Sequence, residues 1–498
     1  MEEPLHVLAC DRQPQDADAL VHRWADGARD RLSFADVGLA SRALASRLSE
    51  AGVRAGMRVA IALPPSPLVP VAHLACSRVG AVSVPLSPML GPDALAPRLA
   101  MAEPALALVH ETRVAAFRQA APRLALWIAQ GRNLRTTRGP LPEDALAASA
   151  PLRERAMSLF FTSGTTAAPK AVVLPHRVIP GRMEGFRRAH PGFAGGRFWS
   201  PAEWSWIGGL HDALFAPWLA GGCVISSERA GHFDPAAAAR LLVEERVESA
   251  FLPPTALKLW RASGAPTPRL SSLHTAGETL PEPLLGWARE AFGAPPREVY
   301  GLTECAFVLV NDEAEPGVTG RAASGAEVAV LAEGSDEPAK PGETGEVCIR
   351  AGAPTMMLGY REAGAIALPV DEGGWLRTGD EARVLEDGRL RVLGRLDDVV
   401  KTSGFRVSPG EVEAALHRHP AVAACAVVGE PDPERGQALV AYVVPAPGHV
   451  AGPALADALR EHAKGHLAAY MAPRAVRFVD ELPTTVNGKL QRRRLRGG

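Results

Sequence analysis

The sequence has little of several features that would point to a function at once. Its six cysteines are scattered, and no two of them have Cys-x-x-Cys spacing, which argues against zinc ribbons and thioredoxin-like chemistry. The formal net charge is −1, so the chain lacks the electrostatic footprint of a nucleic-acid or membrane-surface protein. Aromatic residues make up only 5% of the chain. Because the net charge is close to zero, we expect no nucleic-acid partner.

Long apolar runs are also missing. The most apolar region, residues 59–76, is interrupted by four prolines, so we expect no membrane span. The first residues are acidic and do not have the pattern of a signal peptide. Because unpaired cysteines suit a reducing compartment, we expect a cytoplasmic protein.

What is present suggests a large α/β protein. A chain of 498 residues with 47% hydrophobic residues predicts two or more domains with a substantial core. Between Ser33 and Val109, helical patterns alternate with apolar runs at 58–63, 80–85 and 105–109, which predicts a layered domain with mostly parallel sheets. Residues 405–498 predict a small α+β unit with helices at 411–417 and 453–469 and strands at 422–428 and 438–444.

The stretch Leu159–Leu174 has two apolar runs around a polar middle, which predicts two strands joined by a loop. Hydroxyls that can donate hydrogen bonds lie at Ser163, Thr165 and Thr166. A loop around Gly164 can turn backbone N–H groups toward one anion, and Lys170 adds a positive charge. The alternative is an ordinary polar hairpin loop. The glycine spacing of a Walker A loop is absent.

This stretch resembles the phosphate loop of the acyl-adenylate-forming superfamily, which includes acyl-CoA synthetases, adenylation domains of nonribosomal peptide synthetases and beetle luciferases. The loop of that family reads Thr-Ser-Gly-Thr-Thr-Gly-x-Pro-Lys-Gly, and here Ala167 and Ala171 replace two of the glycines. The resemblance implies nucleotide binding by Thr162, Ser163, Gly164, Thr165, Thr166 and Lys170.

Three tryptophans cluster within residues 197–210, either as core or as the wall of an apolar pocket, where neighbouring glycines would leave room for a ligand. The segment resembles the acyl-pocket helix of the acetyl- and medium-chain acyl-CoA synthetase branch, which makes Trp206, Ile207 and Gly208 candidates for that pocket. In the same family a later loop flanks adenine, which implies this position for Gly277 and Glu278; a generic turn is the alternative.

The string Tyr-Gly-Leu-Thr-Glu at 300–304 is a second match to the family. Tyr300 offers a ring that can stack on adenine, Thr303 can hydrogen-bond the α-phosphate, and Glu304 supplies an oxygen ligand suited to Mg²⁺. The alternative is an exposed helix-capping pair. Acetate-specific relatives have a tryptophan at the position of Gly301, so the resemblance implies an acid larger than acetate.

Two further matches lie near residue 400. After a predicted strand and turn, Asp380 can accept hydrogen bonds from the ribose hydroxyls. In the segment 393–413 the resemblance implies that Arg395 contacts ribose, Asp397 is a hinge, Gly404 borders a pantetheine tunnel and Arg406 approaches the phosphates. The predicted domains are therefore 1–396 and 397–498; a charged linker is the alternative.

The tail resembles the terminal motif of the family, in which a lysine enters the active site. Here this is Lys489, which follows an Asn-Gly turn signal. The three arginines at 492–494 are either a solvated tail or an attraction for a phosphate-rich ligand.

Together these motifs predict an ATP- and Mg²⁺-dependent enzyme that activates a carboxylic acid as its adenylate and transfers the acyl group to coenzyme A. We expect Lys489, Thr303 and Glu304 to be catalytic. One alternative is a stand-alone adenylation enzyme whose acceptor is a carrier-protein phosphopantetheine or an amine. Another is a nucleotide-binding relative without activity, which the two alanines of the loop make conceivable. The identity of the acid and the oligomeric state cannot be predicted from the sequence.

Overall fold

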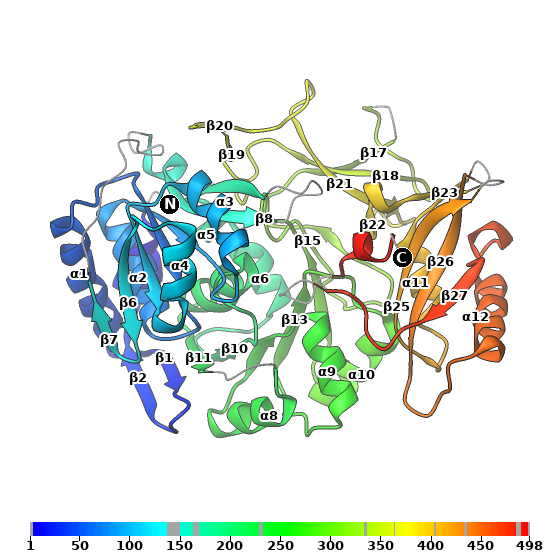
Figure 1. Ribbon diagram of the computed structural model, residues 1–498, viewed down its shortest axis with the longest axis horizontal. Coiled ribbons are helices and arrows are strands. Elements are labelled where there is room, and N and C mark those ends of the chain that lie inside the picture. Colours follow the sequence, from blue (N-terminus) through cyan, green and yellow to red (C-terminus); the bar gives the residue numbers. More distant parts are fainter. Residues whose placement is uncertain are drawn as a thin grey trace.

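The computed structural model describes residues 3–136, 150–162, 169–228, 233–332, 336–362, 364–402, 405–432, 436–484 and 490–496. Among these residues, two nine-stranded sheets, one four-stranded sheet and one five-stranded sheet form the framework (Figure 1). The predicted fold class, a large layered α/β part and a small C-terminal α+β part, is confirmed.

The first large sheet has a parallel centre and antiparallel edges. Its strand order is β20 (Ala365–Ala367), β19 (Gly359–Glu362), β9 (Lys170–Pro175), β8 (Ala156–Thr162), β4 (Val82–Pro85), β3 (Arg58–Ala62), β5 (Leu106–His110), β6 (Ala125–Gln130), β7 (Asn133–Arg135). The associated helices are α1 (Phe34–Glu50), α2 (Leu68–Val79), α3 (Pro92–Ala102) and α4 (Val114–Ala120). The predicted strands of residues 58–109 are present, with boundaries shifted by one or two residues.

Local sequence explains where these helices begin. Helix α1 starts with a reciprocal capping box: Ser33 accepts from the backbone of Asp36, and the Asp36 carboxylate accepts from the backbone of Ser33. Helix α2 starts at Leu68, so Pro70 lies in its first turn, where the backbone N–H groups have no partner inside the helix.

The second large sheet is also parallel at its centre. Its strand order is β16 (Arg321–Ala322), β15 (Leu309–Val310), β14 (Pro296–Tyr300), β13 (Ser272–Ala276), β12 (Ser249–Phe251), β10 (Arg197–Trp199), β11 (Cys223–Ser227), β1 (Asp18–Arg23), β2 (Arg29–Ser33). The associated helices are α5 (Val178–Gly181), α6 (Met183–Ala189), the π-helix η4 (Gly208–Phe215), α7 (Ala216–Leu219), α8 (Pro235–Glu244), α9 (Pro254–Ser263) and α10 (Glu282–Phe292).

Helices from both large sheets share one core. The largest hydrophobic cluster contains Leu74 of α2 together with Phe215 of η4 and Trp218 of α7. The two sheets are therefore packed through helices, as in layered α/β folds.

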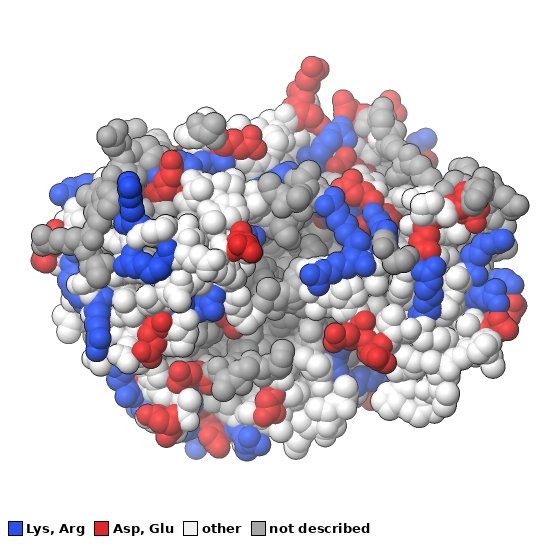
Figure 2. Space-filling model, in the orientation of Figure 1, with Lys and Arg blue, Asp and Glu red and all other residues white. Residues whose placement is uncertain are grey.

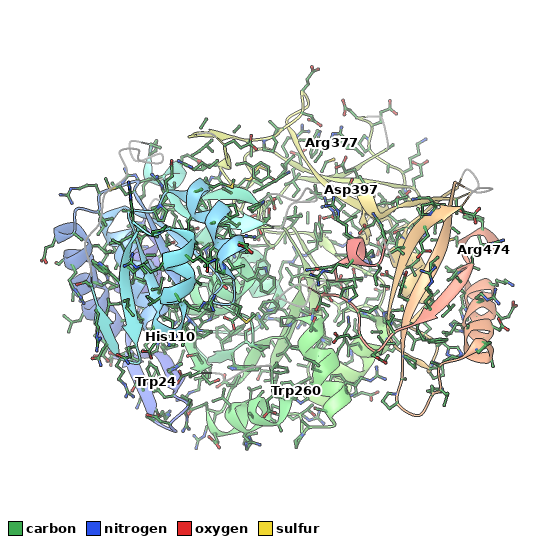
Figure 3. All side chains as sticks on the ribbon, in the orientation of Figure 1. Trp24, His110, Trp260, Arg377, Asp397 and Arg474 are labelled. Atoms are coloured by element: carbon green, nitrogen blue, oxygen red, sulfur yellow. The ribbon has the colours of Figure 1, made fainter. Side chains whose placement is uncertain are left out.

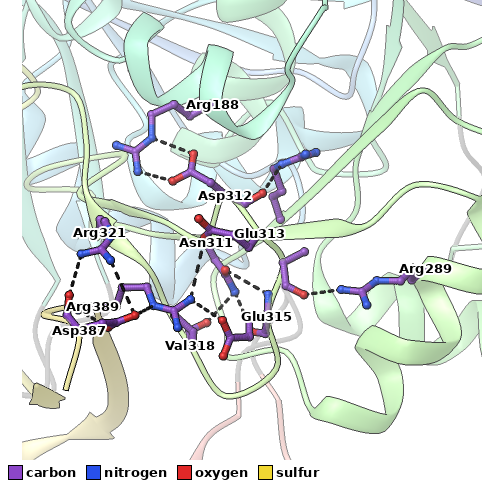
Figure 4. A network of polar contacts seen from close by, with 12 residues as sticks. Arg188, Arg289, Asn311, Asp312, Glu313, Glu315, Val318, Arg321, Asp387 and Arg389 are labelled. Atoms are coloured by element: carbon purple, nitrogen blue, oxygen red, sulfur yellow. Dashed lines mark hydrogen bonds and ion pairs between the residues drawn. The ribbon is translucent and has the colours of Figure 1, made fainter. Parts of the chain in front are cut away.

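A four-stranded antiparallel sheet follows, with the order β17 (Val328–Leu331), β18 (Thr344–Arg350), β21 (Trp375–Val384), β22 (Leu390–Arg395). The loop 311–318 links it to the second large sheet through a polar network (Figure 4). In this network Arg188 of α6 contacts Asp312, and Arg389 near β22 contacts Glu315. These contacts join the loop that follows β15 to α6 and to the start of β22.

The C-terminal sheet has the order β24 (Phe405–Val407), β23 (Val400–Thr402), β26 (Gly436–Pro445), β25 (Val422–Asp432), with β27 (Ala475–Phe478) on β26. It is accompanied by helices α11 (Pro409–Leu416) and α12 (Pro453–His466). Among the described residues, the clusters that line this sheet contain only residues from Val400 onward. Figure 1 shows these elements (orange to red) at one end of the molecule.

Charge is distributed without a single-sign patch on the face shown in Figure 2, where acidic and basic side chains are interspersed. All six cysteines are buried and unpaired. In the described part of the chain, no helix has the length and hydropathy needed to cross a bilayer.

Candidate active site

The hairpin of β8 and β9 confirms the predicted pair of strands around a polar loop. The register pairs Thr162 with Lys170, so the two ends of the loop lie opposite each other. Leu159 and Val172 are fully buried, which anchors the hairpin in the core. The loop residues Ser163, Gly164, Thr165 and Thr166 lie outside the described residues.

Lys170, Tyr360 and Glu304 form a continuous chain of contacts at the start of β9. The ammonium of Lys170 lies 4.9 Å from the centre of the Tyr360 ring, a cation–π distance. The Tyr360 hydroxyl donates to Oε1 of Glu304 at 2.8 Å. Strand β19 pairs antiparallel with β9 and so brings Tyr360 to the hairpin. Burial and the Glu304 carboxylate raise the pKa of Tyr360, which therefore remains a neutral donor.

Tyr300, Asp380 and Arg395 form a second polar group at the end of β14. The Tyr300 hydroxyl donates to Oδ2 of Asp380 at 2.7 Å, and Nη1 of Arg395 lies 3.0 Å from Oδ1. Arg395 also donates to the carbonyl of Thr378 at 2.8 Å. Burial, with a contribution from Asp380, raises the pKa of Tyr300 well above its usual value. The structure thus brings Tyr300 to Asp380 and Arg395, which pair with each other on the neighbouring strands β21 and β22.

Asp380 lies within a strand, and the prediction that it follows a strand and turn was wrong in this detail. Between the pairs Cys348–Arg377 and Glu346–Glu381 the register of β21 shifts, which marks a bulge. Gly379 lies in the bulge with φ of +71°, a conformation that favours glycine. The turn predicted before Asp380 is therefore a bulge within β21.

We call the carboxyl ends of β13 and β14 the floor of the site; Tyr300 of the second polar group is the last residue of β14. Because the two strands are parallel, Gly277 and Gly301 both follow strand ends at the same edge of the sheet. The half-buried Trp206 ring lies beside Gly277, since a Cβ placed there would be 3.4 Å from the ring. Trp206 also packs on Phe251, with ring centres 5.6 Å apart.

The glycines of this region make room for protein atoms. A Cβ on Gly208 would be 2.9 Å from the Trp206 ring, and a Cβ on Gly209 would be 2.0 Å from the carbonyl oxygen of Glu203. A Cβ on Gly301 would be 2.8 Å from the backbone nitrogen of Phe307. The expected room for a ligand above Gly208 and Gly209 is therefore occupied, whereas Trp206 is half-buried and Gly301 is exposed. Ile207 is buried in the core.

Glu278 and Thr303, two further predicted site residues, lie near the ends of β13 and β14. The Glu278 carboxylate forms an ion pair with Lys258 of α9 at 3.6 Å. Thr303 is half-buried on the segment that joins Gly301 to Glu304.

The predicted hinge is exposed at a junction. Asp397 lies in the short 3₁₀ helix η5 (Leu396–Asp398), between β22 and the C-terminal sheet (Figure 3). Its neighbour Asp398 pairs with Arg492 at 3.3 Å and Arg496 at 2.7 Å. Arg492 also pairs with Glu413 at 2.7 Å, so this arginine of the basic tail has structural partners.

Other predicted residues cannot be placed in the site. Gly404 and Lys489 lie outside the described residues. Arg406 belongs to β24, where its backbone pairs with Lys401.

The sequence reasoning missed Tyr360. The chain has only four tyrosines, and two of them, Tyr300 and Tyr360, donate to two of the acidic residues predicted for the site, Asp380 and Glu304. Because tyrosine is rare in this chain, its rarity could have indicated Tyr360 as a candidate site residue. The contact itself depends on β19 joining the edge of β9, which no local pattern predicts.

Glu304 is the candidate ligand for Mg²⁺ in this site. Among the described residues there is no group of three His, Cys, Asp or Glu side chains arranged to hold a metal. Mg²⁺ needs only one or two carboxylates when substrate phosphates supply other ligands. Glu304 accepts one hydrogen bond from Tyr360, through Oε1. A carboxylate with this surrounding fits a metal that is shared with a bound nucleotide.

Comparison with known proteins identifies relatives over almost the whole chain. The model of the AMP-binding enzyme family matches residues 8–361, and that of the AMP-binding enzyme C-terminal domain matches residues 411–489. The feruloyl-CoA synthase of Amycolatopsis sp is 34% identical over 478 residues, which cover 92% of this chain and 92% of the relative. The mitochondrial acyl-coenzyme A synthetase ACSM3 of Mus musculus is 30% identical over 505 residues, 95% of this chain and 85% of the relative. The crystal structure of a Brucella canis acyl-CoA synthetase has 32% identity and a TM-score of 0.72, and the match covers 99% of this chain and 94% of that one.

Proposed function

Because this chain belongs to the family of AMP-binding enzymes, we propose that it is an AMP-forming acyl-CoA synthetase. The observation that carries the proposal is the presence of two tyrosine–carboxylate pairs, Tyr360 with Glu304 beside β9 and Tyr300 with Asp380 at the end of β14. One pair supplies groups for a nucleoside and the other supplies groups for phosphates.

The first half-reaction joins the acid to the nucleotide. A carboxylate oxygen attacks the α-phosphorus of ATP, the bond to the bridging oxygen breaks, and pyrophosphate leaves with its electron pair. The task of the protein is to hold anions in line and to balance their charge. Asp380 and Arg395 would hold the ribose, Tyr300 would stack on adenine, Gly277 and Glu278 would flank that ring, and Arg406 would approach the phosphates.

Lys170, Thr303 and Glu304 would contact the phosphates together with Thr162, Ser163, Gly164, Thr165 and Thr166 of the hairpin. Mg²⁺ bound at Glu304 would neutralise charge on the phosphate oxygens. The Tyr360 hydroxyl orients that carboxylate, because its hydrogen bond fixes one of the two oxygens. Lys489 of the C-terminal motif would neutralise charge during the same step.

The second half-reaction transfers the acyl group to a thiol. The thiolate attacks the acyl carbon, the bond to the AMP oxygen breaks, and AMP leaves. We propose that residues 397–498 form a separate domain that rotates about Asp397 between the two steps, withdrawing Lys489 and opening a tunnel bordered by Gly404.

Among the described residues, the contacts between the two parts include two ion pairs and a hydrogen bond from the Ser408 hydroxyl to the Leu393 carbonyl at 3.2 Å. Arg383 of β21 pairs with Glu411 of α11 at 2.8 Å, and Arg418 pairs with Glu282 of α10 at 3.2 Å. The Arg418 and Glu282 side chains are 48% and 51% exposed, and exposed pairs contribute about 0–1 kcal/mol. The contacts that tie Asp398 to Arg492 and Arg496 lie beyond Asp397 in sequence and can move with the C-terminal part.

The acid is proposed to be larger than acetate: medium-chain, branched or aryl. The partly accessible Trp206 ring and the underlying Phe251 provide an apolar surface beside the strand ends. The acceptor is proposed to be coenzyme A. A carrier-protein phosphopantetheine or an amine is the alternative for the same adenylate.

The proposal is tested by ATP–pyrophosphate exchange with a panel of carboxylic acids, followed by addition of coenzyme A alone. Exchange with some acid and a thioester product are expected. Nucleotide binding without exchange for any acid would contradict the proposed activity. Exchange without thioester formation would favour the carrier-protein or amine acceptor.

The role of Lys489 has its own test. The Lys489→Ala variant should lose pyrophosphate exchange and keep thioester formation from a preformed acyl-adenylate. Lys464→Ala is a matched control, because Lys464 is an exposed lysine of the same part of the chain that pairs with Glu461. Equal loss of both half-reactions in Lys489→Ala would contradict this role.

The hinge is tested by replacing Asp397 with proline, which restricts the backbone at this position. Pyrophosphate exchange should continue while overall turnover falls. Unimpaired turnover would remove Asp397 from the hinge.

A further inference from the structure

A buried histidine lies on the same strand as the floor of the site. His274 and Ala276 are two residues apart in β13, so their side chains share one face of the sheet. Ala276 is half-buried at the carboxyl end of the strand, whereas His274 is 0% exposed. Two residues of a strand span about 6.6 Å. His274 thus lies about that far below the edge at which we place the reacting carboxylate.

Aromatic rings surround His274 on this face. Its ring stacks on Phe251 with centres 4.3 Å apart and planes 5° apart, and the Phe307 ring lies at 6.0 Å. Phe251 in turn contacts Trp206, the partly accessible ring of the candidate acyl pocket. The same layer of rings therefore connects the accessible surface to His274.

The Nδ1 side of His274 is held by a chain of polar groups. Nδ1 of His274 lies 2.5 Å from Nε2 of His190, and Nδ1 of His190 lies 2.7 Å from the Ser272 hydroxyl. The Ser272 hydroxyl lies 2.7 Å from that of Ser249. Burial lowers the pKa of His274 to about 3 and that of His190 well below its usual value, so both rings are neutral.

Two proton arrangements satisfy this chain. If His190 donates to His274, the far nitrogen of His274, Nε2, carries the hydrogen and is a donor. If His274 donates to His190, which donates to Ser272, Nε2 is a bare acceptor. The hydroxyls of Ser272 and Ser249 can rotate to suit either case. His274 can therefore present a donor or an acceptor at Nε2.

Nε2 of His274 has no hydrogen-bond partner among the described residues, although it is fully buried. Buried polar groups are almost always paired, and an unpaired one reduces stability. A histidine that is fixed on one side and unpaired on the other, within an otherwise apolar layer, has the character of a site that recognises a polar group on an apolar ligand.

We propose that the acid substrate carries a hydrogen-bonding group at its distal end, a hydroxyl, phenol or carbonyl, and that Nε2 of His274 binds this group. The inference depends on the proposed acid activation, because it concerns the far end of the same substrate. A substituent on a linear acid of about five or six carbons, or at the para position of an arylacetic acid, matches a depth of about 6.6 Å.

The experiment compares matched acids in the pyrophosphate-exchange assay. The pairs are 6-hydroxyhexanoate with heptanoate and 4-hydroxyphenylacetate with 4-methylphenylacetate, in which a hydroxyl replaces a methyl group. In the wild-type protein, kcat/KM for the hydroxylated acid of at least one pair should exceed that of its partner by about 10- to 100-fold. Equal or reversed preference in both pairs overturns the inference. This comparison needs no variant and therefore does not depend on whether a variant folds.

Two variants locate the effect. His274→Phe should abolish the preference for the hydroxylated acid, since a ring without a polar atom replaces the histidine. Thr275→Val is the matched control: Thr275 is the next residue of β13, faces the opposite side, and also has a buried hydroxyl without a partner among the described residues. It should keep the wild-type preference. A preference retained in folded His274→Phe overturns the assignment to His274. Absence of exchange with every acid is a different result, which removes the proposed activity and the inference with it.

Discussion

Removing one hydroxyl group from Tyr360 tests how the site holds Glu304. In Tyr360→Phe the ring remains, so its contact with the Lys170 ammonium at 4.9 Å is preserved. What is lost is the hydrogen bond to Oε1 of Glu304 at 2.8 Å. The substitution therefore separates orientation of the carboxylate from packing of the ring.

The magnitude follows from the type of bond. A hydrogen bond to a charged group contributes about 1.5–3 kcal/mol, and we take the lower value because Tyr360 is only half-buried. About 1.5 kcal/mol corresponds to roughly a tenfold change in an equilibrium or rate constant. We expect kcat/KM for ATP in pyrophosphate exchange to fall about tenfold.

Tyr442→Phe provides the control. Tyr442 also donates to a carboxylate, that of Glu430 at 2.9 Å, but it lies in the C-terminal sheet. Both variants should lose some free energy of unfolding, whereas only Tyr360→Phe should lower kcat/KM for ATP. Wild-type exchange kinetics in Tyr360→Phe, or an equal decrease in both variants, would refute the reasoning.

Three further predictions concern the framework of the site. Burial raises the pKa of Glu298 from 4.5 to about 7, so ionisation of this carboxyl destabilises the folded state as pH rises from 4.5 to 7. Glu298→Gln removes this ionisation, so its free energy of unfolding relative to wild type, measured with urea, should be higher at pH 7.5 than at pH 5. The same difference at both pH values would contradict the prediction. Gly209→Ala should lower the midpoint of thermal unfolding, because its Cβ would be 2.0 Å from a backbone oxygen. Gly286→Ala in α10 should raise the midpoint, because a Cβ there meets no atom within 4 Å and alanine favours a helix more than glycine does. The opposite order of the two midpoints would contradict the packing. Arg492→Ala removes a partner of Asp398, so proteolysis between residues 396 and 400 should accelerate, and an unchanged cleavage rate would show that the pair does not hold this segment.

Much of the framework could be predicted from local patterns. The strands on either side of the hydroxyl-rich segment and the strands predicted at 422–428 and 438–444 have short-range signals, and the structure contains each of them as β8, β9, β25 and β26. The helix predicted at 453–469 ends earlier, at His466, since the end of a helix depends on tertiary packing more than on pattern. The antiparallel sheet of β17, β18, β21 and β22 was not predicted; β19 and β20, which lie between β18 and β21 in the chain, belong to a different sheet.

By itself, the sequence determined the chemical groups: hydroxyls and a lysine at a hairpin, a tyrosine before a glycine, and acidic residues at 304 and 380. Local order and side-chain type suffice for this, because both are properties of short segments. Only the tertiary structure decided which groups meet. Asp380 reaches Tyr300 because a bulge at Gly379 turns it, and Glu304 is oriented by Tyr360 because β19 joins β9. The glycines next to Trp206 make room for protein atoms, because the folding of this segment brings the Trp206 ring against Gly208 and the Glu203 carbonyl against Gly209.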